Sequence, residues 1–157
     1  MNQNNIHVLA RAVIVHQDQI LLCKTLDLFG VASNFYFLLG GHIEHNENAE
    51  SALLRELHEE TGAKDCIIKR FLGCLEYSFA LGTNSLCHSH EYNFIFEVTS
   101  DSLKIYNTIP KLEDHIELQW IQLSKLNEID FRAAPLKMLI PEWLNSDPVN
   151  KIFRSSM

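Results

Sequence analysis

Several features that mark other classes of protein are scarce or absent in this sequence. Its four cysteines include no Cys-x-x-Cys pair, so we expect buried, reduced thiols and neither a disulfide framework nor a cysteine-based zinc site. No uninterrupted apolar run approaches the roughly 18 residues that a membrane span requires. The first apolar residues are not preceded by the basic segment of a signal peptide. These absences predict a cytoplasmic protein with no membrane partner.

Basic charge and glycine-rich phosphate loops are scarce as well. Twenty Asp and Glu residues outnumber thirteen Lys and Arg residues, and the net charge of −7 argues against a nucleic-acid partner. There is no Gly-x-Gly-x-x-Gly motif and strands do not alternate with helices in the predicted order, which argues against a doubly wound dinucleotide-binding fold. The 157 residues are 46% hydrophobic and 21% charged, as in ordinary globular proteins. We expect one domain over residues 1–157.

Short apolar runs and alternating patterns predict strands along most of the first hundred residues and one strand later. Val8–Val15 and Ile20–Lys24 flank a short polar stretch and are expected to form a hairpin. In Glu91–Val98, aromatic and apolar residues alternate with polar ones, which is typical of a strand buried on one face. The other predicted strands are Phe35–Leu39, Cys66–Phe79 and Ile116–Ile121.

Two helices are expected among these strands. The first runs from about Asn48 to Thr61, with Asn46 or Asn48 as its N-cap and Gly62 in the left-handed position after its end. The second follows from apolar residues at helical spacing between 136 and 144, and Pro141 should kink or shorten it. Strands with helices on their faces predict an α+β fold or a three-layer α/β sandwich.

Most of the negative charge lies in one short segment. Residues 41–63 contain six glutamates and one cation, Arg55, and so carry −5 of the −7, while the rest of the chain has fourteen acids against twelve bases. The six glutamates of this segment are Glu44, Glu47, Glu50, Glu56, Glu59 and Glu60.

The first helix would place three of these carboxylates together. At about 100° per residue, Glu56, Glu59 and Glu60 fall within an arc of roughly 100°, beside an apolar stripe. Like charges at this spacing destabilise a helix by about 0.2–0.5 kcal/mol per pair. The simplest interpretation is a solvated acidic face, but it gives no stabilising reason for placing the three carboxylates together. A divalent cation would reverse the sign of that effect. The stripe beside the carboxylates consists of Leu53, Leu54 and Leu57.

The residues around this helix favour the metal hypothesis. Gly40 and Gly41 end a predicted strand just before the helix, and a glycine pair allows a backbone carbonyl to approach a ligand. Arg55 can clamp Glu47 or Glu56 and so hold a carboxylate in position. This arrangement resembles the Nudix box of the Nudix hydrolases, and all seven positions of that pattern match. It consists of Gly41, five residues, Glu47, seven residues, and then Arg55-Glu56-Leu57-His58-Glu59-Glu60-Thr61-Gly62.

The resemblance implies a fold and an activity. The fold is the Nudix-type α/β/α sandwich with a mixed β-sheet. The activity is the Mg²⁺-dependent hydrolysis of a nucleoside diphosphate linked to another moiety, with water attacking a phosphorus of the diphosphate; Mn²⁺ is the alternative metal. The substrate would be a nucleoside triphosphate, a nucleotide sugar or ADP-ribose, and no subgroup motif distinguishes among them. A homodimer is left open.

The resemblance also implies roles for individual residues. The metal ligands would be Glu56, Glu59, Glu60 and the Gly40 carbonyl, and Glu56 is also a candidate for deprotonating the attacking water. The catalytic set would further include Arg55 and Glu47, which orient the carboxylates.

Candidates outside the motif have plainer alternatives. Glu113 is the best-placed further catalytic acid and Glu91 the second, although either can be an ordinary surface acid. Phe35, Tyr36 and Phe37 are candidates for stacking a base, with core packing as the alternative, and alternation along a strand lets at most two of them share a face. His90 lies at a strand end where it can meet substrate, as can Glu91. Arg11, Lys69 and Arg70 are candidates for contact with a terminal phosphate or are simply exposed.

Two other functions compete with hydrolysis. One is a catalytically silent nucleotide-binding or sensing module of the same fold, against which the complete carboxylate set argues. The other is an isomerase of prenyl diphosphates, which would need a cysteine and an acid placed for proton transfer, and the sequence marks no such pair.

Overall fold

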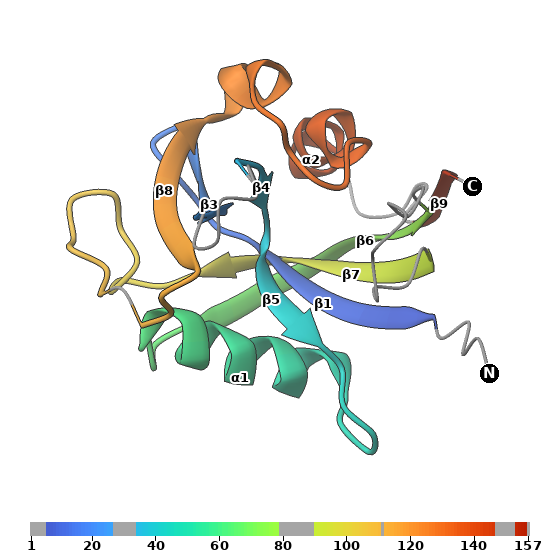
Figure 1. Cartoon of the computed structure of the whole chain (residues 1–157), viewed down its shortest axis with the longest axis horizontal. Helices are drawn as coiled ribbons and strands as arrows, with labels where there is room; N and C mark the ends of the chain where they lie inside the picture. Colours follow the sequence, from blue (N-terminus) through green and yellow to red (C-terminus); the bar gives the residue numbers. More distant parts are fainter. Residues whose placement is uncertain (1–5, 27–33, 79–89, 111, 147–152, 157) are drawn as a thin grey trace.

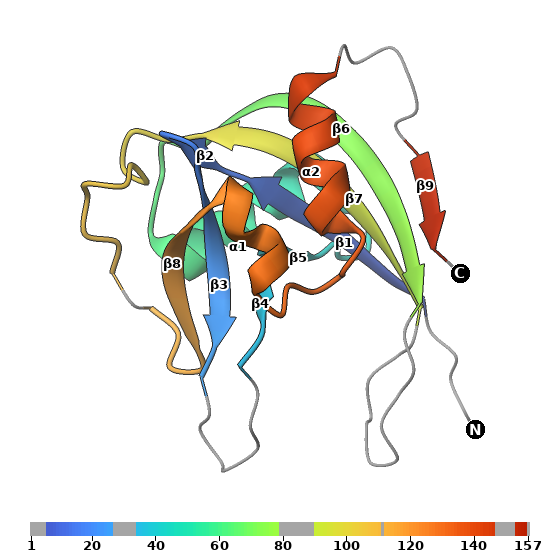
Figure 2. The same cartoon turned by 90° about the horizontal axis from the view of Figure 1, so that it is seen from above.

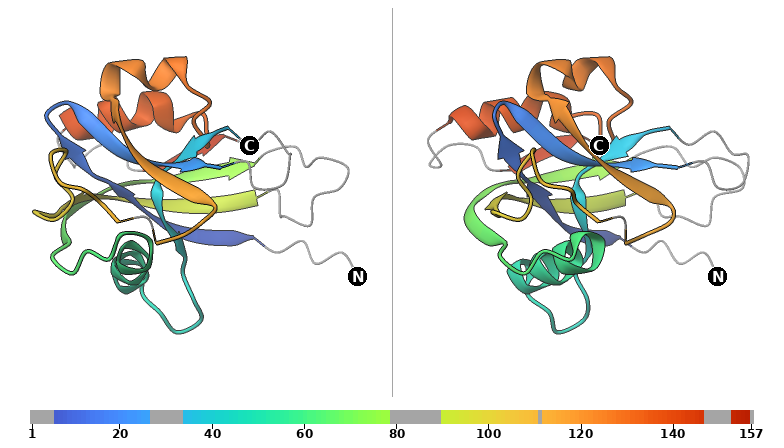
Figure 3. Two further views of the ribbon diagram at one scale, coloured as in Figure 1. Left: turned by 60° about the vertical axis from the view of Figure 1, so that its left-hand side comes forward. Right: turned by 90° about the vertical axis from the view of Figure 1, so that its left-hand side faces the viewer.

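The structure, a computed structural model, describes residues 6–26, 34–78, 90–110, 112–146 and 153–156. Its centre is a mixed β-sheet with one α-helix on each side (Figure 1). Helix α1 (Ala49–Thr61) lies against one face, and helix α2 (Leu136–Asn145) lies against the other, together with a second, smaller sheet (Figure 3). The predicted layering of helix, mixed sheet and helix is therefore confirmed.

The larger sheet has five strands in the order β5-β1-β7-β6-β9. Strand β1 pairs parallel with β7, and β6 pairs parallel with β9, whereas β1–β5 and β6–β7 are antiparallel. The short strand β9 lies beside β6 at the edge of the sheet (Figure 2). The strands are β1 (His7–Val13), β5 (Leu39–His42), β6 (Ile67–Ser78), β7 (His90–Thr99) and β9 (Phe153–Ser156).

The smaller sheet is built around β3, which pairs antiparallel with β2, β4 and β8. A 3-10 helix, η1 (Leu123–Glu128), follows β8 directly and was not expected from the sequence, nor was β9. The strands are β2 (Val15–His16), β3 (Gln19–Thr25), β4 (Tyr36–Phe37) and β8 (Ile116–Gln122).

The predicted hairpin of Val8–Val15 with Ile20–Lys24 is correct only at its tip. Val15 pairs with Ile20 around a turn and the Ile14 carbonyl still accepts a hydrogen bond from the Leu21 N–H, but the residues up to Val13 belong to β1 in the other sheet. The chain therefore changes sheets inside one apolar run. Periodicity marks a strand but not its partner, because the partner is selected by packing among distant segments.

Strand β7 was expected to be buried on one face, and that expectation is wrong. Phe96 and Val98 pack in the core beneath α1, while Asn93 and Ile95 on the opposite face are 3% and 0% exposed. Because both faces of the central sheet are covered, alternation in the sequence does not separate a buried face from an exposed one here.

Helix α1 begins and ends where the sequence predicts. The Asn48 side chain accepts a hydrogen bond of 2.9 Å from the Ser51 N–H, and Gly62 follows the last turn with φ of 74°. The expected apolar stripe is wrong in one member, because Leu54 is 39% exposed. Leu53 and Leu57 are fully buried, and Leu54 lies too far around the helix to share their contact with the sheet.

Helix α2 is not ended by Pro141, which lies inside it. The proline removes one backbone hydrogen bond, and the buried side chains of Ile140 and Trp143 on either side keep the helix against the sheet. Neither α-helix in the described ranges has the length and apolar character needed to cross a bilayer. Cys23 and Cys74 are buried free thiols and Cys66 is half-buried, while Cys87 lies outside the described residues.

Candidate active site

Arg55 on α1 gathers three of the acidic side chains. Its Nε and Nη2 each donate a hydrogen bond of 3.0 Å to one oxygen of Glu47, in a two-pronged pair. Its Nη1 donates to Glu56 at 2.9 Å and to Glu59 at 3.4 Å, and its Nη2 also reaches the His42 carbonyl. The predicted clamp is thus present, with Glu47 as its principal partner.

The pairing of Arg55 with Glu47 favours the charged form of both side chains. The hydrogen bonds from Arg55 hold the pKa of Glu47 below its ordinary value, and the pair in turn raises the pKa of Arg55. Because Glu47 belongs to the loop before α1, this pair ties the loop to the helix.

Glu60 differs from the other two helix carboxylates because it is only 7% exposed. Its Oε2 accepts a hydrogen bond of 2.9 Å from the Gly40 N–H. Burial raises the pKa of this carboxyl to about 8, and the Gly40 hydrogen bond and the charge of Arg11 lower it only in part. Glu60 thus holds a proton more readily near neutral pH than an ordinary carboxyl does.

The two glycines of β5 are set in different surroundings, and only Gly40 is confined by the backbone. Gly40 has φ of 109°, and a Cβ there would overlap the carbonyl of Ala10 in β1. At Gly41 a Cβ would overlap the carboxylate of Glu56. The absence of a side chain at Gly41 therefore leaves the space that the Glu56 carboxylate occupies.

Arg11 reaches the same glycine pair from β1. Its Nη1 donates to the carbonyl of Leu38 at 3.1 Å and to the carbonyl of Gly40. The backbone of Gly40 therefore contacts the Arg11 guanidinium through its carbonyl oxygen and the buried carboxyl of Glu60 through its N–H.

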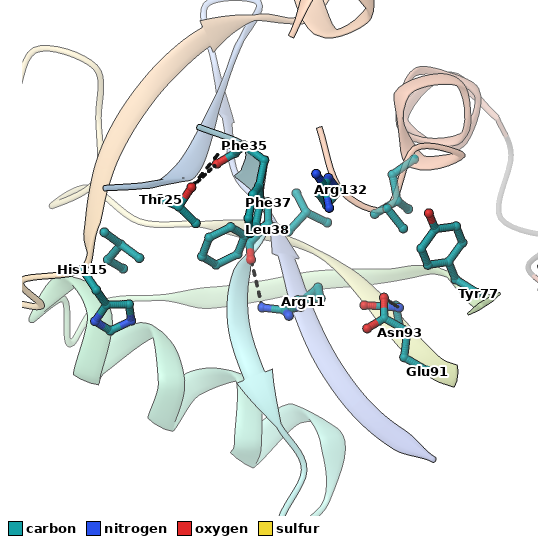
Figure 4. A pocket seen from close by; sticks show the side chains of 13 residues that line it. Arg11, Thr25, Phe35, Phe37, Leu38, Tyr77, Glu91, Asn93, His115 and Arg132 are labelled. Atoms are coloured by element: carbon teal, nitrogen blue, oxygen red, sulfur yellow. Dashed lines mark hydrogen bonds between the residues drawn. The ribbon is translucent and has the colours of Figure 1, made fainter. Parts of the chain in front are cut away.

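A cavity of about 400 Å³ opens beside Arg11 (Figure 4). The rings of Phe35 and Phe37 lie 6.0 Å apart in its wall, and the Arg132 guanidinium lies 4.6 Å from the centre of the Phe35 ring. Glu91 and Asn93 line it from β7, where the Asn93 amide donates a hydrogen bond of 2.9 Å to Glu91. An apolar pocket with a few converging polar groups thus adjoins the row of carboxylates.

The sequence matches the family model described as NUDIX domain over residues 6–141. The chain belongs to the Nudix hydrolase family. The nucleoside triphosphatase NudI of Escherichia fergusonii is 28% identical to this Nudix hydrolase over 127 residues, which cover 81% of this chain and 89% of that protein.

Solved structures share the fold of this Nudix hydrolase. The E. coli ORF135 protein superimposes with a TM-score of 0.67 at 17% identity, over 93% of this chain and 96% of that one. The MutT protein from Methanosarcina mazei Go1 superimposes with a TM-score of 0.66 at 17% identity, over 91% and 96% of the two chains. At these identities the two structures establish the fold alone.

The aromatic candidates in this Nudix chain are divided between two faces. Phe35 lines the cavity, but Tyr36 is not among the lining residues, and its hydroxyl donates a hydrogen bond of 3.0 Å to Gln119. The third candidate, Phe37, lies two residues after Phe35 and lines the same cavity, because side chains of an extended segment alternate.

The strand-end candidates are also separated. Glu91 lines the cavity, whereas His90 faces the other side of β7, where its Nε2 lies 3.1 Å from Glu76 Oε1. Tyr92 donates to the same oxygen at 2.6 Å. The hydrogen bonds from Tyr92 and His90 contribute to a lowered pKa of Glu76, so His90 belongs to a polar cluster outside the cavity.

Glu113 lies close to the acidic helix although it is far from it in sequence. It shares the wall of a smaller cavity of about 220 Å³ with Glu60 and Glu117. Its Oε2 lies 3.0 Å from His115 Nε2, and its charge contributes to the raised pKa of Glu60. The phosphate candidate Arg70 instead pairs with Glu97 at 2.6 Å, on another part of the sheet.

The residues fit a hard divalent cation in chemistry. Across the described ranges, no three His, Cys, Asp or Glu side chains are grouped so as to hold a metal ion. Glu56 and Glu59 are turned to Arg55 instead, and Glu60 to the Gly40 N–H. Carboxylate and carbonyl oxygens are the donors that Mg²⁺ and Mn²⁺ prefer, and the space at Gly41 already holds one such carboxylate.

Sequence reasoning missed several neighbours of the site. Asn93 was assigned no role, and Arg132 was not considered. Cys23 was also missed: its buried Sγ lies 4.0 Å from Glu60 Oε1, and burial strongly raises the pKa of the thiol. This is a cysteine–acid pair of the kind an isomerase would need, but Cys23 is 0% exposed and so is closed to a substrate.

Proposed function

We propose that this Nudix hydrolase cleaves a nucleoside diphosphate linked to another moiety, with Mg²⁺ or Mn²⁺ as its cofactor. The observation that carries the proposal is the position of the Gly40 backbone between two sites. Its N–H holds Glu60 in the acidic row, and its carbonyl is held by Arg11, which lines the aromatic cavity. A nucleoside in the cavity would have its diphosphate beside the carboxylates.

The acidic row supplies the groups that such a reaction needs. Glu56, Glu59, Glu60 and the Gly40 carbonyl would hold the cation. When bound, the cation neutralises the charge of the diphosphate and makes its phosphorus open to attack by water. Glu56 is the proposed acceptor of the proton from that water, and Glu113 is a second candidate from across the smaller cavity.

Arg55 and Glu47 have a different task. Neither lines the 400 Å³ cavity, and their two-pronged pair fixes the guanidinium whose Nη1 donates to Glu56 and Glu59. Groups behind metal ligands that fix the ligands' orientation typically change metal affinity or activity by 10–100-fold when they are replaced.

The cavity is the proposed nucleoside site. Phe35 and Phe37 offer flat apolar surfaces, and base–aromatic stacking contributes about 1–3 kcal/mol per base. The Glu91 carboxylate can accept hydrogen bonds from the amino group of a base. The relation to NudI, which is named a nucleoside triphosphatase, favours nucleoside triphosphates among the three candidate classes.

A substrate screen tests the proposal. Nucleoside triphosphates, nucleotide sugars and ADP-ribose are incubated with Mg²⁺ or with Mn²⁺, and phosphate and nucleotide products are measured. At least one class should be hydrolysed, with turnover abolished by chelation and reduced by about 100-fold or more in Glu59→Gln and Glu60→Gln.

The matched control is Glu50→Gln, an exposed glutamate in the first turn of the same helix, which should retain full activity. Full activity in both Glu59→Gln and Glu60→Gln would refute the proposal. Binding of nucleotides without turnover would instead favour the silent module. The cytoplasmic location and the homodimer stay predictions.

A further inference from the structure

Arg11 occupies a position between the two parts of the site. It lies in β1, opposite Gly40 of the edge strand β5 and Ile95 of the central strand β7. Its guanidinium points to the side of the sheet that carries the aromatic cavity, and it is one of the residues lining that cavity (Figure 4).

The contacts of Arg11 conflict with the binding of a cation. Its Nη1 donates to the Leu38 and Gly40 carbonyls, and its charge acts on the nearby carboxyl of Glu60. The Gly40 carbonyl is one of the ligands assigned above to a divalent cation. A guanidinium and a divalent cation repel each other, so simultaneous contact of both with the Gly40 carbonyl oxygen is electrostatically unfavourable.

The cavity offers Arg11 an alternative position. The guanidinium carbon already lies 5.8 Å from the centre of the Phe37 ring, and the open volume of about 400 Å³ adjoins it. Glu91 is the one acidic side chain among the described residues that line this cavity, and it already accepts a hydrogen bond from Asn93. A phosphate entering the cavity would present oxygens that match the planar fork of an arginine.

We propose that Arg11 is a positioning residue that couples the binding of the divalent cation to the binding of the diphosphate. Without ligands it holds the Gly40 carbonyl; when the cation binds, it releases that carbonyl and turns to the phosphate of the substrate. The inference rests on the proposed function, because it takes Gly40 as a metal ligand. Coupling of this kind is reciprocal, so each ligand strengthens the binding of the other.

The first test measures binding rather than turnover. The affinity for Mn²⁺ is determined by calorimetry and by the EPR signal of free Mn²⁺, with and without methylenediphosphonate, a diphosphate that cannot be hydrolysed at its bridge. The solution affinity of Mn²⁺ for the diphosphonate is measured separately and subtracted. In the unaltered protein, the diphosphonate should raise the Mn²⁺ affinity by at least about fivefold.

Arg11→Met should bind Mn²⁺ alone more tightly than the unaltered protein, because the Gly40 carbonyl is free and a repelling charge is gone. Its gain from the diphosphonate should fall by at least about fivefold. Arg132→Met is the matched control, since it removes a guanidinium from the same cavity that does not contact Gly40; its affinity for Mn²⁺ alone should be unchanged. A purely structural Arg11 would lower the melting temperature of the Met variant and leave the coupling as it was, which would overturn the inference.

A second measurement needs no Met variant. The side-chain Nε–Hε resonance of Arg11 is assigned by its loss in Arg11→Lys and followed by NMR while Mg²⁺ is added to the unaltered protein. Its chemical shift should change at the same Mg²⁺ concentration as that of the Gly40 backbone amide, which reports on Glu60 because it donates a hydrogen bond to that carboxyl. A shift of the Gly40 amide with no change at Arg11 would overturn the inference.

Failure of the inference and failure of the proposed function can be told apart. If the unaltered protein binds neither Mg²⁺ nor Mn²⁺, the proposed function fails as well. If it binds the cation and turns over substrate, and the coupling in Arg11→Met is unaltered, only the role of Arg11 is refuted.

Discussion

The backbone N–H of Gly40 donates a hydrogen bond of 2.9 Å to Oε2 of Glu60, which lies 20 residues later in the chain. This bond fixes the end of α1 to the last strand before it. It also satisfies one oxygen of a carboxyl that is almost completely buried. The position of Glu60 therefore depends on the sheet as much as on the helix.

Glu60 should make the stability of the metal-free protein depend on pH. Its pKa is raised by burial from 4.5 in the unfolded chain to about 8 in the folded one, so the folded state favours the protonated form. The stabilisation is complete below pH 4.5 and is lost as the pH rises through about 8. The melting temperature measured between pH 5 and 9 with a chelator should thus fall in the unaltered protein because of this group.

Glu60→Gln should remove that part of the dependence, because a neutral amide oxygen can still accept the Gly40 hydrogen bond. Added Mg²⁺ should reduce the loss in the unaltered protein at high pH and have little effect on the variant, since a bound cation favours the ionised carboxylate. Parallel pH curves for the two proteins would show that Glu60 does not titrate in this range.

Replacing Arg55 by lysine should lower kcat/KM by about 10–100-fold. Lysine keeps the charge but loses the planar fork that holds both oxygens of Glu47 and reaches Glu56. Steady-state kinetics at several Mg²⁺ concentrations would measure the loss. Arg154→Lys, which alters an ion pair with Glu142 on α2, is the control and should keep the unaltered rate. An Arg55→Lys enzyme with normal kinetics would mean that the clamp has no role in the reaction.

Phe35→Ala should raise KM, by about 5–150-fold if the full stacking energy of 1–3 kcal/mol is lost, with a smaller effect on kcat. The ring forms part of the cavity wall and carries the guanidinium of Arg132 on its face. Tyr106→Ala is a suitable control, because Tyr106 is 67% exposed and is not among the residues lining the cavity. Equal KM values for the Phe35 variant and the unaltered enzyme would place the nucleoside elsewhere.

The two glycines of β5 should respond differently to alanine. Gly40→Ala forces a side chain into φ of 109° and into the Ala10 carbonyl, so it should cost at least about 1–3 kcal/mol in the free energy of unfolding. Gly41→Ala should chiefly displace the Glu56 carboxylate and lower kcat with a smaller loss of stability. Urea unfolding together with kinetics would separate the two effects, and a Gly41→Ala enzyme with full kcat would show that Glu56 needs no such space.

Much of the acidic site could be predicted because its geometry is local. Glu56, Glu59 and Glu60 share one side of a helix through their spacing alone, and the caps at Asn48 and Gly62 follow from backbone preferences of single residues. The environment of Glu60 could not be predicted, since it is buried by strands from other parts of the chain. The exposure of Leu54 has the same origin, because the sheet decides which part of the helix surface is covered.

The sequence by itself determined the acidic helix, its motif and hence the Nudix family, because these depend on residues within about one turn or one loop of each other. Only the tertiary structure decided that Arg11 meets Gly40, that Glu113 meets Glu60, and that Phe37 rather than Tyr36 lines the cavity with Phe35. Contacts of this kind depend on strand register and on which sheet each strand joins. Both are selected by packing among segments far apart in the chain, which no local pattern encodes.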